Sequence, residues 1–273
     1  MHNALFEALG INARYLPFAP EPENFDHAVC GFRSMKFRGA NVTIPYKTEF
    51  MESDGSPRLL DELSDISKFT GSVNTLYWKD GVAGGTLCGT TTDPYGCIRN
   101  LEEHGVSVSG KKIALLGNGG AAKAISFTLV EQGNALTIVC RTLEKGKALA
   151  DSLNEHFTAG QTVQVATFEQ FEGISADFDI IINATSVGMT PHTDESPIGE
   201  GCLHSGQAVC DIVYTPPMTK LLQMAKAKGC KIVTGEGMLV HQGLESFKKW
   251  FPAEVAGHTN EELTAIMRKG MQG

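Results

Sequence analysis

The middle of the chain repeats one pattern of apolar and polar positions: a short apolar run, a turn, and a longer stretch with helical spacing. Three consecutive isoleucines within Asp179–Asn183 are typical of a strand that is buried on both faces of a parallel sheet. Because parallel strands are joined by right-handed crossovers, the pattern predicts a doubly wound, Rossmann-type sheet. The expected strands lie at 113–116, 135–139, 163–166, 179–183, 207–213 and 231–234, and the expected helices lie at 120–132 and 143–156.

The segments on either side of this pattern read differently. Residues 1–96 alternate helical and strand-like pieces, with helices expected at 2–9 and 23–35 and strands at 39–44 and 71–78. Two further helices, 238–250 and 259–271, have no strand after them. They could cover the Rossmann sheet or return to the first domain, and we favour the return.

The sequence therefore predicts an α/β protein of two domains. Residues 1–98 together with 238–273 form an N-terminal α/β substrate domain, which the C-terminal helices rejoin. Residues 99–237 form a Rossmann-type nucleotide-binding domain.

A glycine-rich turn follows the expected strand 113–116. Gly117, Gly119 and Ala122 have the spacing G-x-G-x-x-A. The first glycine permits a tight turn, the second lets the backbone approach a pyrophosphate, and the small third residue lets helix and strand pack closely. The helix that follows directs its N-terminal N–H groups at the phosphates. The predicted contacts in this turn are Gly117, Asn118, Gly119, Gly120 and Ala121.

The residues after the second Rossmann strand favour NADP(H) over NAD(H). An acidic residue that binds the ribose 2′-hydroxyl is expected there in NAD-binding proteins, but this chain has Cys140-Arg141-Thr142 and then Lys145. Arg141 can form a fork of hydrogen bonds to a 2′-phosphate, and Lys145 adds positive charge. The alternative is that both are ordinary solvated residues at the start of a helix.

Composition excludes some classes of partner. The net charge of −8, without a basic stripe, argues against nucleic acid and anionic membranes. Seven cysteines without a C-x-x-C motif indicate a reduced, cytoplasmic protein with small buried thiols. The sequence shows neither a signal peptide nor an apolar stretch near the ~18 residues of a membrane span. It also has no clustered His/Cys pattern, so no metal site is expected.

Three polar clusters precede residue 100: Asn41-Val-Thr43-Ile-Pro-Tyr-Lys47, Val73-Asn74-Thr75 and Gly89-Thr-Thr91-Thr92-Asp93. Taken singly, each has an ordinary explanation as a solvated lysine, a turn or a helix N-cap. Their order, followed by the glycine turn, resembles the shikimate dehydrogenase family. Downstream, Val139–Thr142, Asn183–Met189, Asp211–Tyr214 and Gly235–Gln242 resemble further motifs of that family.

The resemblance implies reduction of 3-dehydroshikimate to shikimate by NADPH, with Lys47 and Asp93 as the catalytic pair. Hydride arriving at a carbonyl carbon places negative charge on its oxygen, which a nearby ammonium stabilises and protonates. A carboxylate beside the ammonium favours the ionised form of both. The resemblance also assigns ring hydroxyls to Thr43, Asn74 and Gln242 and places Tyr214 near the same pocket. It assigns the cofactor to Arg141, Thr142, Lys145, Thr185, Ser186, Val213, Gly235 and Met238.

Beside an apparent short insertion at residues 53–58, the chain departs from the family at three places. Members usually begin with a strand and a Ser-x-Ser-Pro loop that binds the substrate carboxylate, whereas this chain starts at Met1-His2-Asn3. We therefore expect that strand and loop to be lacking, through truncation or loss. Thr91 and Cys140 each stand where an asparagine is usual.

Two other functions stay open. One is a paralogue that acts on quinate, and the other is a non-catalytic NADP(H)-binding sensor whose substrate binding was lost with the N-terminal loop. In each case a small molecule is the expected ligand, and the protein is expected to be a monomer or a homodimer.

Overall fold

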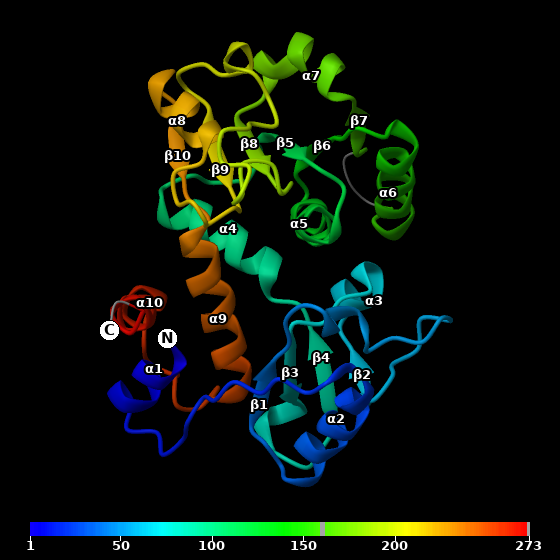
Figure 1. The fold of residues 1–273 in the computed structure, drawn as a ribbon, viewed down its shortest axis with the longest axis vertical. Coiled ribbons are helices and arrows are strands. Elements are labelled where there is room, and N and C mark those ends of the chain that lie inside the picture. The colour runs from blue at the N-terminus through cyan, green and yellow to red at the C-terminus, as the bar shows by residue number, and fades with distance from the viewer. Residues whose placement is uncertain (159–161, 272–273) are drawn as a thin grey trace. The chain divides into compact units, whose positions relative to one another are not determined.

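The computed structural model describes residues 1–158 and 162–271, and the chain divides into two compact units (Figure 1). The first unit comprises residues 1–92 and 240–273, and the second comprises residues 93–239. Within the described residues, no helix combines the length and the apolar character needed to cross a membrane.

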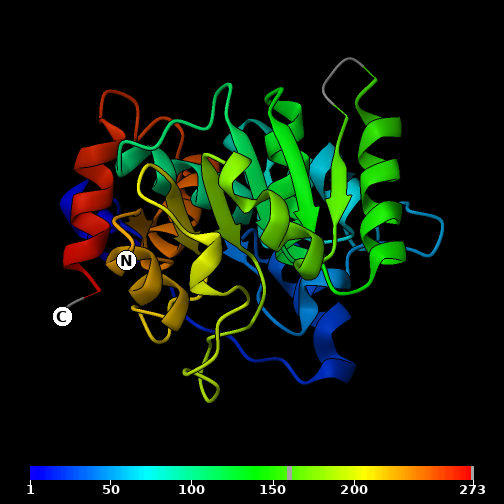
Figure 2. The ribbon, with the colours of Figure 1, turned by 90° about the horizontal axis from the view of Figure 1, so that it is seen from above.

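The second unit is built on a six-stranded sheet in which every neighbouring pair is parallel. Its order, β10-β9-β8-β5-β6-β7, confirms the predicted Rossmann-type fold, and its strands appear side by side in Figure 2. Strand β8 is buried throughout and β5 is buried after Lys112, as expected for apolar runs without polar alternation. The strands are β5 Lys112–Leu116, β6 Ala135–Val139, β7 Gln164–Ala166, β8 Ile180–Asn183, β9 Ala208–Asp211 and β10 Lys231–Val233.

Helices α4 to α8 belong to the same unit. They are α4 Asp93–Glu103, α5 Gly120–Glu131, α6 Leu143–His156, α7 Phe168–Ile174 and α8 Lys220–Ala227, with short 3₁₀ turns at Ser175–Asp177 and Glu200–Cys202. The domain boundary that we expected after residue 98 would cut α4. The whole helix instead lies in the second unit, where Cys97 and Leu101 are fully buried.

The first unit contains a four-stranded sheet of order β1-β3-β4-β2. Pairs β1–β3 and β3–β4 are antiparallel, and β2–β4 is parallel. The strands are β1 Gly39–Asn41, β2 Glu62–Leu63, β3 Thr75–Trp78 and β4 Leu87–Thr90. The helices are α1 His2–Ala8, α2 Phe25–Ser34, α3 Asp65–Thr70, α9 Glu236–Trp250, which begins in the second unit, and α10 Asn260–Lys269, with 3₁₀ turns at Pro22–Asn24, Tyr46–Thr48 and Lys79–Gly81.

Two apolar clusters stabilise this unit. One joins α2 to the sheet through Phe32, Phe50 and Trp78, and the other joins α1, α9 and α10 through buried residues such as Leu5, Phe247 and Met267. Trp250 connects helix α9 to the sheet, because its indole N–H donates to the carbonyl of Leu76 over 2.9 Å. A Cβ on Gly39 would lie 2.0 Å from the Trp250 ring, so only glycine fits there.

All seven cysteines are free thiols. Six are buried, and Cys30 is exposed.

Candidate functional site

The glycine turn has the geometry that its spacing predicts. Gly117 has φ +109°, which favours glycine, and its N–H donates to the carbonyl of Val139 over 2.7 Å. A Cβ built on Gly119 or Gly120 would meet nothing within 4 Å, whereas Ala122 is fully buried in the contact between helix and sheet. The turn therefore leaves open space at the N-terminus of α5, where backbone N–H groups can receive a pyrophosphate.

The predicted adenosine-side residues lie at the end of β6. Arg141 and Lys145 are both exposed, and neither makes an ion pair with any described residue. Thr142 is the N-cap residue of α6, and its side chain makes no capping hydrogen bond. Both charges are therefore available to an anionic ligand.

Cys140, the residue that follows β6, is buried. It is 1% exposed, and a Cβ on Gly146 would come within 2.5 Å of its Sγ. Burial raises the pKa of its thiol. The residue at this position therefore packs inward against α6.

A cavity of about 310 Å³ lies beyond the carboxyl ends of β8 and β9. Four of the predicted residues line it: Thr185, Ser186, Val213 and Tyr214. The side chains of Met189 and Tyr214 are 46% and 58% exposed, so the cavity is open to solvent. Carboxyl ends of strands are where ligands bind in doubly wound sheets.

A buried carboxylate stands behind this cavity. Asp211 accepts from Asn183 Nδ2 (3.0 Å), from the Val213 N–H (3.0 Å) and from the Thr219 hydroxyl (2.7 Å). It is fully buried, and desolvation raises its pKa to about 6 against these three hydrogen bonds, which lower it. Thr185 in turn donates its hydroxyl (2.7 Å) and its N–H (3.0 Å) to Asn183 Oδ1.

Gly235 and Met238 are the remaining residues that we predicted to bind the cofactor. They lie where β10 leads into α9. A Cβ on Gly235 would lie 2.5 Å from the carbonyl oxygen of Ile212, so this backbone packs directly against the segment that contains Val213. The N–H of Met238 donates to the carbonyl of Gly235 (3.2 Å).

In the first unit, the predicted substrate residues gather at the start of β3. The N–H of Val42 donates to the carbonyl of Asn74 (2.7 Å), and the N–H of Val73 donates to the carbonyl of Lys47 (2.8 Å). The loop that carries Thr43 and Lys47 is thus held at both ends to the segment that carries Asn74.

Asn74 is the centre of this cluster. It is 2% exposed, and its Oδ1 accepts from the Thr75 hydroxyl (2.7 Å) and the Thr92 N–H (2.9 Å). These donors fix the orientation of the amide. Its Nδ2 therefore faces the other way and donates to the Thr92 hydroxyl (3.1 Å) and to Gln242 Oε1 (3.4 Å).

The sequence interpretation missed the supporting residues of this cluster. The hydroxyl of Ser246 lies 2.7 Å from that of Thr75 and accepts from Asn41 Nδ2 (2.9 Å). Ser246 and Gln242 are four residues apart on α9, so they share one helix face. The spacing of four residues between two polar side chains of the helix is the signal that could have identified Ser246.

Asp93 is the first residue of α4, in the second unit, directly after the anchored Thr92. Its pairing with Lys47 and the proximity of Tyr214 to the substrate residues stay predictions.

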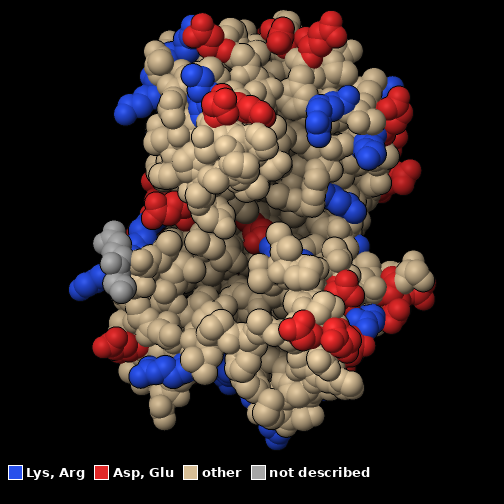
Figure 3. Space-filling model, viewed as in Figure 1, with Lys and Arg blue, Asp and Glu red and all other residues tan. Residues whose placement is uncertain are grey.

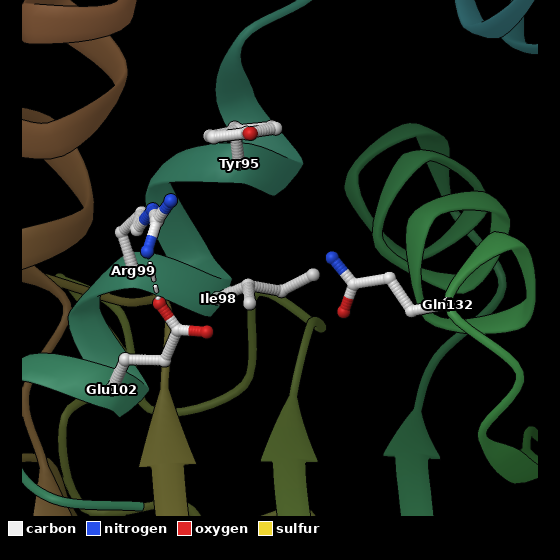
Figure 4. Close-up of a pocket in the computed structure, with 5 residues that line it drawn as sticks. All are labelled: Tyr95, Ile98, Arg99, Glu102 and Gln132. Carbon is white, nitrogen blue, oxygen red and sulfur yellow. Dashed lines mark hydrogen bonds and ion pairs between the residues drawn. The ribbon is translucent and has the colours of Figure 1, made fainter. Parts of the chain in front are cut away.

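A second hollow, of about 50 Å³, is lined by Tyr95, Ile98, Arg99, Glu102 and Gln132, and contains no predicted residue (Figure 4). Across the part of the chain that the structure describes, no group of three His, Cys, Asp or Glu residues could hold a metal ion.

Comparison with known proteins finds matches for segments of both units. Residues 1–76 match a family model described as the shikimate dehydrogenase substrate binding domain, and residues 100–197 match one described as shikimate / quinate 5-dehydrogenase. The shikimate dehydrogenase (NADP(+)) of Methanothermobacter thermautotrophicus is 40% identical over 92% of this chain and 84% of its own length.

Solved structures agree with the sequence comparisons. Shikimate 5-dehydrogenase from Listeria monocytogenes, in complex with shikimate and NAD, is 32% identical with a TM-score of 0.85 over 98% of this chain and 89% of that one. A shikimate dehydrogenase in complex with NADP⁺ is 36% identical with a TM-score of 0.83 over the same shares of the two chains.

Proposed function

We propose that this chain, which belongs to the shikimate dehydrogenase family, catalyses the reversible NADPH-dependent reduction of 3-dehydroshikimate to shikimate. The observation that carries the proposal is the polar cluster of the first unit. There, Asn74 directs its amide donor toward Gln242, beside the loop that carries Thr43 and Lys47. A site built from such groups suits a small polyol, because an analogue that lacks a hydroxyl leaves buried polar groups unpaired.

Lys47 is assigned the proton transfer. When the substrate carbonyl is reduced, negative charge develops on its oxygen, and the Lys47 ammonium stabilises that charge and donates a proton to it. Asp93, the other member of the proposed pair, is assigned to the same substrate oxygen or to the adjacent hydroxyl. Thr43, Asn74 and Gln242 orient the ring through its hydroxyl groups.

The residues of the second unit fit a dinucleotide. The open turn at Gly119 and Gly120 and the N-terminus of α5 suit the pyrophosphate, and Arg141, Thr142 and Lys145 suit a 2′-phosphate. The cofactor, when bound, supplies the hydride. We assign the cavity lined by Thr185, Ser186, Val213 and Tyr214 to its nicotinamide end and the adjoining segment at Gly235 and Met238 to the same end.

The direct test is the change in NADPH absorbance with purified protein. Shikimate with NADP⁺ should give turnover, and omission of shikimate should abolish it. Binding of NADP⁺ by calorimetry without turnover of any substrate would favour a sensor and contradict the enzyme.

Quinate is the second candidate substrate, because one of the matching family models is described by both compounds. Quinate carries one more ring hydroxyl than shikimate. The ratio of kcat/KM for shikimate and quinate, measured with NADP⁺ and again with NAD⁺, decides between the two and tests the cofactor preference.

We infer further that the enzyme works in the cytoplasm, since all seven cysteines are free thiols. Acidic and basic side chains are interspersed on the face shown in Figure 3, consistent with a small-molecule substrate rather than nucleic acid or membrane as partner. A monomer or homodimer is expected, and light scattering on the purified protein distinguishes them.

A further inference from the structure

We propose that Asp211 is a positioning residue that sets the shape of the nicotinamide end of the cofactor site without touching a ligand. The inference rests on the proposed function for the identity of the ligand. Its own basis is the set of hydrogen bonds that joins three segments of the second unit at one buried carboxylate.

The register of the sheet brings Asn183 and Asp211 together. Asn183 and Asp211 are the last residues of β8 and β9, and they are direct partners across this parallel pair. Their side chains meet because Asn183 Nδ2 donates to Asp211 Oδ1 over 3.0 Å. Both residues are fully buried, so neither contacts a ligand in the cavity.

Asn183 and Asp211 each hold one residue that lines the cavity. Asn183 Oδ1 accepts from the N–H and the hydroxyl of Thr185, and Asp211 Oδ1 accepts from the N–H of Val213. Thr185 and Val213 lie on opposite loops and both line the cavity. The Asn183–Asp211 hydrogen bond therefore fixes the two loops relative to each other.

Thr219 binds the second oxygen of Asp211. Thr219, the N-cap residue of α8, is fully buried and donates its hydroxyl to Asp211 Oδ2 over 2.7 Å, while its oxygen accepts from the N–H of Leu222. A Cβ on Gly188 would lie 3.6 Å from Thr219 Cβ, so the turn after Val187 packs on the same residue. Both oxygens of Asp211 are thus used, and the three donors are neutral groups on three segments.

Substitution should separate positioning from general stability. In Asp211→Ala, the two loops lose their common acceptor, so we expect the Kd of NADP⁺ to rise at least tenfold and kcat to fall. Adenosine 2′,5′-bisphosphate has no nicotinamide and reports only the adenosine side at Arg141, so its Kd should change less than twofold. Calorimetry measures both ligands without turnover.

Two further variants keep the test decisive if Asp211→Ala does not fold. Asp211→Asn retains an acceptor for Val213 and Asn183 and can donate to the Thr219 hydroxyl, so it should bind NADP⁺ within about threefold of wild type. Thr219→Val removes one donor of the set and should weaken NADP⁺ binding several-fold. Thr137→Val, at a buried threonine of β6 in the same sheet, is the matched control and should change neither Kd.

Unchanged NADP⁺ binding in Asp211→Ala or Thr219→Val would overturn the proposal. Equal weakening of NADP⁺ and the bisphosphate would also overturn it, because that outcome indicates a general structural defect. Failure of the wild-type protein to oxidise shikimate would contradict the proposed reaction instead, and the binding comparison would still decide the role of Asp211.

Discussion

The side-chain amide of Asn74 donates to the side-chain carbonyl of Gln242 over 3.4 Å, and this contact joins residues from the start of β3 and from α9. Asn74 is also held by Thr75 and Thr92, so its amide is fixed in orientation. In Gln242→Ala, we expect the KM for shikimate to rise about three- to tenfold, which corresponds to one net hydrogen bond of about 0.5–1.5 kcal/mol. The Kd of NADP⁺ should not change.

Steady-state kinetics with shikimate varied at saturating NADP⁺ measure this effect. Gln223→Ala, at an exposed glutamine of α8, is the control and should leave the KM unchanged. An unaltered KM in Gln242→Ala would remove Gln242 from the substrate site.

Lys47 should matter for the chemical step more than for binding. Loss of a positioned acid typically lowers the rate about 10²–10⁴-fold, so kcat of Lys47→Ala should fall by that range. Lys68→Ala is the matched control, because Lys68 is an exposed lysine of the same unit. Wild-type kcat in Lys47→Ala would disprove the assigned role.

Arg141 should determine the preference for the phosphorylated cofactor. A hydrogen bond to a charged group contributes about 1.5–3 kcal/mol, so Arg141→Ala should raise the KM for NADP⁺ about 10- to 100-fold. The KM for NAD⁺, which lacks the 2′-phosphate, should change little. Lys147→Ala, at an exposed position of α6, should affect neither cofactor, and a parallel loss with both cofactors would contradict the argument.

The glycine turn offers a prediction that separates binding from folding. A Cβ at Gly119 meets no protein atom within 4 Å, so Gly119→Ala should fold normally and lose NADP⁺ affinity, because the methyl group enters the space left for the ligand. Gly117→Ala should instead lower the melting temperature, because φ is +109° and Thr185 Cγ2 lies 3.0 Å away. Gly173→Ala, with open space and no positive φ, should change neither property.

The sequence predicted the Rossmann-type unit to within a few residues. The bounds 135–139 and 143–156 coincide with β6 and α6, because each apolar run is enclosed by polar residues and the helix has one continuous pattern. The strand expected at 71–78 is shorter in the structure. Gly71 has φ +69° and ends α3, and the chain becomes a strand only at Thr75.

The site was predicted less completely, for a physical reason. The spacing of the glycines depends on local backbone geometry and can be read directly. In contrast, Asn183 and Asp211 are 28 residues apart in sequence and meet only through strand pairing. Likewise, the sequence shows Cys140 in place of a usual asparagine, but its burial at the end of β6 is visible only in the structure.

The ionisation of Asp211 should be visible in stability. Burial raises its pKa from 3.8 to about 6, so the folded protein holds this proton more strongly than the unfolded chain does between those pH values. Ionisation therefore lowers the free energy of unfolding of the wild type as pH rises from 4 to 7, by about 3 kcal/mol for two pKa units. The asparagine of Asp211→Asn does not titrate. The stability of this variant relative to wild type should therefore increase as pH rises from 4 to 7.

Urea unfolding of both proteins at pH 4, 5, 6 and 7 gives the difference, in which the other titrating groups cancel. Asp179→Asn is the control, because the pKa of Asp179 is shifted in the opposite direction. The N–H of Lys112 lowers the pKa of Asp179, so its carboxylate stabilises the folded protein at neutral pH and this contribution is lost as pH falls. The difference in stability between Asp179→Asn and wild type should therefore stay nearly constant from pH 4 to 7, because this contribution is lost only below the unfolded pKa of 3.8. A difference between Asp211→Asn and wild type that stays constant from pH 4 to 7 would show that Asp211 does not titrate in this range.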